Sequence, residues 1–483
     1  MPRTYSGIRE QREYTDTYLD LAGSSLQIEQ DFKKKCIKNA DRTFSQSYQC
    51  QELNSISALL SVNDAVLIAH APQGCVGCIT MGADMYRVAQ IHRGAEKITS
   101  PKILITNLDQ SDVIMGGEGK LRESIRLASE RYKPKLIFVF TSCASGIIGD
   151  DVDAIVREAQ PDTEALIVPV HCDGFRSKIC ASGYDAAFIA ISKFVLKGAV
   201  PKKEKGLINL FAPMTVSFAD QLEIEKLLRR IGLKSNFLPF FSDYDKVLNI
   251  PNAEASTSIC KVFADEFMKD IEHDFGIPYA HTVMPVGIRN TDKWYRAIAE
   301  ITGKGDEVEE IIATEHARIQ PELDKIKLKL QGKSVFICGG TGRSFAAATL
   351  IDDFGMKLLG IETPVYDLDA QDDIAFLNDI HGDYLIDVAN MLPFEQVNIV
   401  NKLKPDVFIG VPSWSSRFGI PTTHILDPKR PTMGYDGIVW LGNKIAAQIE
   451  NPGFNKKLSK YARLPYRESW YDEDPFKFIK EVI

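Results

Sequence analysis

The sequence predicts an α/β protein built from three Rossmann-like domains with mostly parallel sheets. Short apolar runs typical of buried strands alternate with helical stretches along the chain, which is the pattern of repeated β-α-β units. The length of 483 residues exceeds that of a single-core domain and corresponds to roughly three units of about 150 residues. The two observations together favour three α/β domains in one chain.

The strand-like runs define the domain boundaries that we expect. A polar N-terminal arm at 1–49 precedes a first domain at 50–203, a second at 204–331 and a third at 332–483, which includes a C-terminal tail rich in aromatic and charged residues. The expected strands are AVLIAHA (65–71), KILITNL (102–108), KLIFVF (135–140), ALIVPV (165–170), LINLF (207–211), the run at 279–286 and SVFIC (334–338), followed by KLLGI, DYLIDVA, DVFIGV and THIL, and the expected helices include 120–132, 184–196 and 221–231.

Composition and charge restrict the function classes. A net charge of -8 argues against a nucleic-acid-binding protein. The first 30 residues lack the apolar centre of a signal peptide, and no run of 18 apolar residues predicts a membrane helix. An odd number of cysteines, nine, indicates reduced thiols or metal ligands rather than disulfides. We therefore expect a cytoplasmic protein.

Cysteines follow three of the strand-like runs. Cys75 comes after 65–71, Cys143 after 136–140, and Cys172 after 165–170. Ligands in open α/β sheets bind beyond the carboxyl ends of the strands, so these positions favour a metal site with soft ligands. For Cys143 alone, a buried thiol that acts as a small hydrophobic residue is equally consistent with the sequence.

Two glycine or cysteine motifs give weaker signals. GGTGRSF at 339–345 follows a strand, but it matches neither G-x-G-x-x-G nor a P-loop, so a close approach of the backbone to another ligand is favoured over a nucleotide site. CVGC at 75–78 has the spacing of zinc sites and redox dithiols, but a zinc site needs a second pair, which is missing.

One combination of motifs resembles a known family. Cys50, then Cys75 in HAPQGC, then Cys143 in TSCASGIIGDDVDAI, are followed by HCDGFRSKICASG at 171–183, by Cys260 ahead of a helix and GIP, and by GIPTTHILDPKRPTMGYDG at 419–437. From about Cys50 to Gly437 this series resembles the α-type subunit of the nitrogenase component 1 family.

The resemblance implies cofactors and partners. Cys50, Cys75 and Cys143 would hold half of an [8Fe-7S] P-cluster shared with a β-type subunit in an α2β2 heterotetramer. Cys260 and His424 would hold a large iron–sulfur cofactor in the cleft between domains, and the sequence leaves its heterometal open. Thiolates and imidazole suit these roles. An ATP-hydrolysing iron protein dimer with a [4Fe-4S] cluster would supply electrons. Further expected contacts with the cofactor come from Gly339, Gly340, Arg343 and Arg176.

Departures from the family pattern concern the substrate. The positions that supply a glutamine and a histidine in dinitrogen-reducing enzymes hold Cys180 and Tyr184 here, Ala83 and Gly342 replace arginines, and Met433 replaces a histidine. The usual lysine is missing from GVPSWSSRF at 410–418. Within the family the chain is most similar to the methylthio-alkane reductases, which implies reductive carbon–sulfur cleavage with Tyr184, Cys180 and Arg176 at the substrate face. A dinitrogen reductase and a non-catalytic scaffold for cofactor assembly remain the alternatives.

Overall fold

The computed structural model describes residues 20–37, 39–43, 50–77, 79–177, 181–213, 215–260, 262–280, 283–366, 371–389, 392–410 and 415–480. The chain divides into two compact units. Of the described residues, 50–218 and 228–280 form the first unit, and 20–43, 219–227 and 283–480 form the second. None of the described helices is both long and apolar enough to cross a membrane.

The first sheet of the first unit consists of four parallel strands in the order β4-β3-β5-β6. Its strands are β3 (Ala65–His70), β4 (Ile103–Ile105), β5 (Leu136–Thr141) and β6 (Leu166–Val170), each within a run that the sequence predicted. Alternate residues of β3 and β5 are buried on opposite faces, which explains why both strands are apolar throughout.

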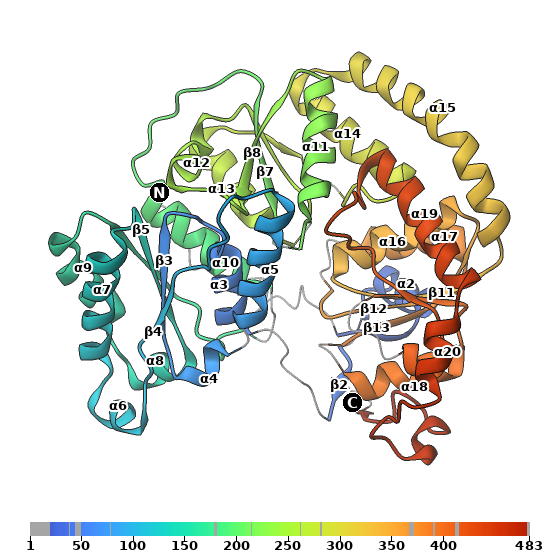
Figure 1. The fold of residues 1–483 in the computed structure, drawn as a ribbon, viewed down its shortest axis with the longest axis horizontal. Coiled ribbons are helices and arrows are strands. Elements are labelled where there is room, and N and C mark those ends of the chain that lie inside the picture. Colours follow the sequence, from blue (N-terminus) through green and yellow to red (C-terminus); the bar gives the residue numbers. More distant parts are fainter. Residues whose placement is uncertain are drawn as a thin grey trace. The chain divides into compact units, whose positions relative to one another are not determined.

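Helices cover both faces of this sheet. In Figure 1, α7 (Glu118–Tyr132) and α9 (Val152–Ala159) lie on one side of β3 and β5, and α3 (Gln51–Leu59) and α10 (Ser182–Ala190) lie on the other. The connections contain further helices: α4 (Gln73–Val76), α5 (Ile79–His92), α6 (Gln110–Met115), α8 (Cys143–Ile148) and, after α10, a π-helical turn at Ile191–Val195.

A second sheet in the same unit has the order β10-β9-β7-β8 and is also parallel. The sequence predicted a strand at 279–286, but the observed strand contains only its first two residues. Residues 283–286 are not a strand, and 281–282 lie outside the described residues. The strands are β7 (Leu207–Ala212), β8 (Lys234–Pro239), β9 (Ala255–Ser258) and β10 (Tyr279–Ala280), with helices α12 (Tyr244–Leu248) and α13 (Asp265–Phe275). Helix α11 (Phe218–Arg230) is divided, because its residues 219–227 are grouped with the second unit.

The second unit is built on a six-stranded sheet in the order β1-β13-β12-β11-β14-β15, parallel except for β1. Part of the N-terminal arm therefore forms an edge strand of its own chain. The strands are β1 (Ala22–Ser24), β11 (Ser334–Cys338), β12 (Lys357–Thr363), β13 (Leu385–Val388), β14 (Val407–Gly410) and β15 (Thr422–Thr423).

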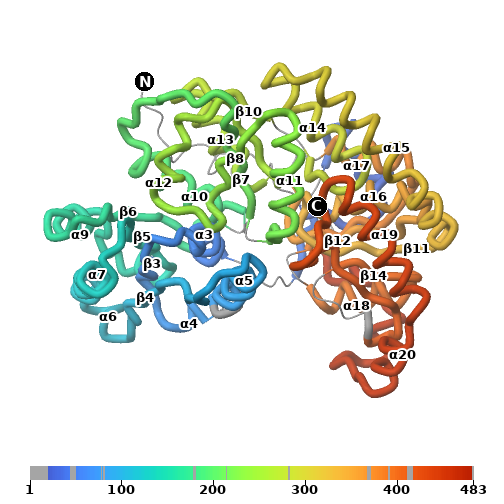
Figure 2. The backbone as a smooth tube through the Cα atoms, turned by 45° about the horizontal axis from the view of Figure 1, so that its top comes forward, coloured from blue at the N-terminus to red at the C-terminus, as the bar shows by residue number. Residues whose placement is uncertain are grey.

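Helices α14 (Ile288–Thr302) and α15 (Gly305–Leu330) belong to this second unit. The sequence had placed both within the predicted domain at 204–331. Figure 2 shows α15 running beside α19, and α14 also contacts α15, α16 and α19. The described residues thus form three large sheets, two in the first unit and one in the second, and the three-domain division stays a prediction. The helices of the second unit are α2 (Ser25–Lys33), α14 (Ile288–Thr302), α15 (Gly305–Leu330), α16 (Thr341–Asp353), α17 (Gln371–His381), α18 (Pro393–Leu403), α19 (Gly434–Glu450) and α20 (Gly453–Ser459).

The C-terminal tail packs on its own chain. The indole N–H of Trp470 donates to the carbonyl of Phe394 at 2.8 Å, and the Asn398 amide on α18 donates to the carbonyl of Trp470 at 2.5 Å. Strand β16 (Ile479–Lys480) pairs antiparallel with β2 (Asp41–Arg42), so the C-terminal tail and the N-terminal arm form a two-stranded ribbon.

Candidate metal centre

Two cysteines of the predicted cluster site, Cys50 and Cys143, lie at helix starts. Cys50 is the N-cap of α3, where its sulfur accepts a hydrogen bond from the Leu53 N–H at 3.5 Å. Cys143 is the first residue of α8, directly after β5, and the preceding Ser142 forms a capping box with Ser145. Serine caps favour helix initiation, so the local sequence fixes where this cysteine emerges.

Cys75 joins them from the neighbouring strand. It lies on α4, one short turn after β3, and β3 pairs with β5 in the register His70 to Thr141. The Ser142 hydroxyl donates to the His70 carbonyl at 2.7 Å, which ties the end of β3 to the start of α8. Adjacent parallel strands end side by side, so the two loops meet at one edge.

Gly174 lies close to two of the cysteines, Cys50 and Cys143. A Cβ added at this glycine would lie 3.1 Å from the Cys143 sulfur and 3.2 Å from the Cys50 Cβ, both closer than ordinary contact. The pKa of the Cys75 thiol is raised to about 11, mainly by burial and then by the charges of Glu52, Cys143 and Cys50. The structure thus brings Cys50 and Cys143 together, and the meeting of all three thiols in one cluster site stays a prediction.

Acidic groups surround this three-cysteine site. Burial, and then Asp173, raises the pKa of Glu52 to about 8, and burial likewise raises the pKa of the Cys50 thiol. Asp173 is almost fully buried and forms a 2.5 Å ion pair with the half-exposed Arg176. Thiols are disfavoured as thiolates beside acids and become thiolates when a cationic metal cluster is bound. The donor set of three thiols fits an iron–sulfur cluster.

Cys172 does not take part, contrary to the expectation that the third strand end also delivers a ligand. Its side chain is fully buried, its N–H donates to the Thr141 hydroxyl at 2.8 Å, and its thiol donates to the Thr141 carbonyl at 3.3 Å. Burial raises its thiol pKa well above the ordinary value, so it is a structural thiol. Among the described residues, no three His, Cys, Asp or Glu side chains are arranged to hold a single metal ion.

Cys260 and Tyr184 both belong to the first unit and border the same apolar core. Cys260 follows β9, where its N–H donates to the Ser258 hydroxyl at 3.2 Å. The ring of Tyr184 on α10 packs edge-on against Phe263, with 4.8 Å between ring centroids. Both Cys260 and Tyr184 are partly buried at the margin of the same apolar core. Cys180 lies outside the described residues.

His424 lies in the second unit, after β15, with an imidazole suited to a ligand role. Its Nδ1 is buried and has no hydrogen-bond partner among the described residues. Burial lowers the pKa of His424, and the charge of Lys444 lowers it further, so the neutral form that binds metals is favoured. Such an orphaned buried nitrogen is costly unless something binds it, which fits a metal ligand.

Two cations hold the loop that carries this histidine. The Lys444 ammonium donates to the His424 carbonyl at 3.0 Å, and the buried Arg343 guanidinium donates to the carbonyl of Ile425 at 3.0 Å. Arg343 follows Gly339 and Gly340, which link β11 to α16. Gly339, Gly340, Arg343 and His424 thus share the second unit. Cys260 belongs to the first, so the pairing of Cys260 with His424 stays a prediction.

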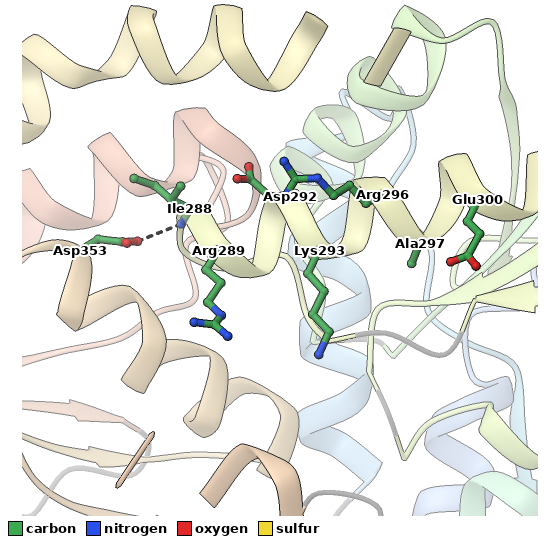
Figure 3. A pocket seen from close by; sticks show the side chains of 8 residues that line it. All are labelled: Ile288, Arg289, Asp292, Lys293, Arg296, Ala297, Glu300 and Asp353. Atoms are coloured by element: carbon green, nitrogen blue, oxygen red, sulfur yellow. Dashed lines mark hydrogen bonds between the residues drawn. The ribbon is translucent and has the colours of Figure 1, made fainter. Parts of the chain in front are cut away.

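Some of these features were not anticipated from the sequence. Gly174 gave a signal only as part of the CDGF segment, and Lys444 is a single lysine on a helix with no motif around it. The second unit also contains a pocket of about 600 Å³ that no sequence motif predicted. Figure 3 shows that Arg289 and Lys293, which line it, point to the same side of α14. At one end of the pocket, Asp353 accepts a hydrogen bond from the Ile288 N–H at 2.8 Å. The residues that line this pocket include none of the predicted site.

Comparison with known proteins decides the family. Residues 50–450 match the profile described as nitrogenase component 1 type oxidoreductase. The chain belongs to the nitrogenase component 1 family. This confirms the family predicted from the cysteine pattern, together with the α/β fold and its mostly parallel sheets.

Individual relatives in the family fall into two groups. The chain is 28% identical over 385 residues to the nitrogenase iron-molybdenum cofactor biosynthesis protein NifE of Methanococcus maripaludis, covering 77% of this chain and 76% of the relative. It is 26% identical over 407 residues to the nitrogenase molybdenum-iron protein alpha chain of Methanothermobacter marburgensis, covering 81% and 85%. A solved structure named nitrogenase Cp1 at pH 5 has the same fold, with a TM-score of 0.71 at 21% identity over 89% of this chain and 94% of that one.

Proposed function

We propose that this chain is the catalytic α-type subunit of a nitrogenase-like reductase that cleaves the carbon–sulfur bond of methylthio-alkanes. The observation that carries the proposal is the approach of Cys50 and Cys143 to Gly174, at the sheet edge where Cys75 also follows a strand. An enzyme of this type also needs a second ligand set, and the chain retains both Cys260 and His424. With two clusters bound, electrons from an ATP-hydrolysing iron protein would reach the substrate.

The proposed reaction is R–S–CH₃ + 2 e⁻ + 2 H⁺ → R–H + CH₃SH. The carbon–sulfur bond breaks, a carbon–hydrogen bond and a sulfur–hydrogen bond form, and the iron protein is the reductant. When bound, the large cofactor would supply the electrons and the site of substrate reduction. Tyr184, held against Phe263, would donate a proton through its phenol, and Cys180 would shape the pocket. Arg176 is engaged by Asp173, so its role would be to balance charge near the thiols.

The surface beside the three-cysteine site supports a partner subunit. Five apolar side chains there are more than half exposed, and α6 packs on α8, the helix that begins with Cys143. Exposed apolar patches of this kind mark protein interfaces. A β-type subunit would cover them and complete the P-cluster in an α2β2 heterotetramer. The five are Val113, Ile114 and Met115 of α6, Ile147 of α8, and Phe175.

The test is an anaerobic assay of the chain purified with its β-type partner and iron protein, with ATP and a methylthio-alkane. Headspace analysis should detect the hydrocarbon and methanethiol. Tyr184→Phe should lower turnover by about 10²-fold, the lower range for loss of a general acid. Cys143→Ala should abolish turnover and lower the iron content, whereas the matched control Cys172→Ala should retain its iron. Ammonia from dinitrogen, without cleavage of the thioether, would establish the dinitrogen-reducing alternative instead.

A second candidate function is a scaffold on which the cofactor is assembled. The 28% identity to a NifE protein favours it. His424→Ala separates the two functions, because an enzyme should lose substrate reduction while a carrier should still deliver its cluster to an acceptor. Delivery by the wild-type chain without any reduction of substrate would establish the scaffold.

A further inference from the structure

Three carboxyl groups are buried together in the second unit, at the carboxyl ends of its central strands. Glu362 is the penultimate residue of β12, Asp387 is the penultimate residue of β13, and Glu395 lies in the first turn of α18. In the sheet register, Glu362 is paired with Asp387 on one side and with Cys338 on the other. Each of these three acidic residues is at most 2% exposed. We call Glu362, Asp387 and Glu395 the buried carboxyl cluster.

The cation that forms ion pairs with this cluster is Arg42. Arg42 on β2 is bonded to Asp387 at 2.8 Å and to Glu395 at 3.2 Å, and it also donates to the Val388 carbonyl at 2.8 Å. In the described part of the chain, the ion pairs of the cluster all go to this guanidinium. Asp20, ahead of β1, is a further acid that acts on Asp387 and raises its pKa. If all three carboxyls were ionised, the cluster and Arg42 would carry two uncompensated negative charges away from water, which is strongly unfavourable.

The contacts within the cluster favour bound protons. Asp387 and Glu395 depend on the same Arg42 guanidinium, and the Asp387 Oδ2 is buried without a hydrogen-bond partner among the described residues, which disfavours its ionised form. Glu362 accepts from the Gln396 amide at 2.8 Å, and that amide also donates to the Cys338 sulfur at 3.3 Å. Burial raises the pKa of Asp387 to about 6 and of Glu395 to about 7, and it raises the pKa of Glu362 well above its ordinary range. The burial of three acids and the single guanidinium beside them therefore both favour bound protons in the cluster.

We propose that the buried carboxyl cluster is a proton-storing site. Glu362 holds one proton, and Asp387 and Glu395 share a second, which brings the three carboxyls and Arg42 to zero net charge. Because interacting acids release protons in steps that belong to the group, the shared proton exchanges near neutral pH.

The store lies beside the loop that leads toward His424. The Gly339 N–H donates to the Glu362 carbonyl at 3.2 Å. Arg343, in the first turn of the helix that follows, donates to the carbonyl of Ile425, the residue after His424. That the stored protons serve a reduction rests on the proposed function, in which each carbon–sulfur cleavage consumes two protons. The store itself is a property of this chain and does not need bound clusters.

Infrared spectroscopy of the full-length, cluster-free chain tests the proposal through the C=O stretch of protonated carboxyl groups. Other buried acids such as Glu52 and Asp353 also contribute to this band, so the measured quantity is the difference spectrum between the wild type and Glu362→Gln. At pH 7 the variant should lack one protonated-carboxyl component. Glu309→Gln is the matched control, because Glu309 is held ionised on the surface by Arg296, and it should leave the band unchanged.

A second variant tests the role of the single cation. Arg42→Met removes the positive charge that stabilises the ionised acids, so the protonated-carboxyl band should persist to higher pH than in the wild type. A folded Glu362→Gln chain whose band at pH 7 equals that of the wild type would overturn the proposal, as would an Arg42→Met band that disappears at lower pH. Because neither measurement involves turnover, a positive infrared result with no thioether cleavage would refute the proposed function alone.

Discussion

Replacing Gly183 with alanine should push α10 away from α3, the helix that begins after Cys50. Gly183 is the second residue of α10 and lies where the two helices cross. A Cβ at this position would lie 2.4 Å from the Gln51 carbonyl oxygen, 2.7 Å from the Asn54 Cβ and 2.9 Å from the Ser55 nitrogen. The Ser55 hydroxyl also donates to the Gly183 carbonyl at 2.7 Å, so the crossing is fixed from both sides.

The expected cost follows from what the methyl group would meet. Overpacking of a core costs about 1–3 kcal/mol, and here the upper part applies because two of the three atoms are backbone atoms that no rotamer change can move. Alanine in a helix recovers about 0.5–1 kcal/mol relative to glycine. The free energy of unfolding should therefore fall by about 1–2 kcal/mol.

Urea unfolding followed by circular dichroism measures this change. The matched control is Gly119→Ala, which is also the second residue of its helix, α7, but has no atom within 4 Å of the added Cβ. That variant should gain about 0.5–1 kcal/mol. If Gly183→Ala is as stable as Gly119→Ala, the close crossing of α3 and α10 is refuted.

Three further predictions concern single side chains. Lys444→Met should raise the pKa of His424, because the Lys444 ammonium lowers it in the wild type. NMR on the cluster-free chain measures this pKa, and an unchanged value would contradict the effect of Lys444 on the imidazole. Burial raises the pKa of Asp353 to about 7 from 3.8, so the folded chain binds this proton more tightly and stability should fall as pH rises from about 4 to 7. Asp353→Asn should flatten that slope in urea titrations, and a slope equal to that of the wild type would refute it. Cys172→Ala should lower stability by about 1–2 kcal/mol through lost packing, and a neutral result would place this thiol outside the core.

The sequence by itself determined the features that depend on local patterns. Apolar runs predicted the buried strands of the first sheet, and the residues after them placed Cys75 and Cys143 at strand ends. Strand ends can be read locally because side-chain periodicity and helix caps are properties of neighbouring residues. The family could be recognised for the same reason, since its cysteines stand in short local motifs.

Only the tertiary structure decided which of these side chains act together. Cys172 follows a strand, as Cys75 does, yet its thiol donates a hydrogen bond to the Thr141 carbonyl and is buried in the core. Arg42 meets Asp387 across 345 positions of the chain, and Lys444 reaches the carbonyl of His424 from a separate helix. No periodicity encodes such pairs, because the direction of a side chain at a strand end and its distant partners are set by the packing of whole elements.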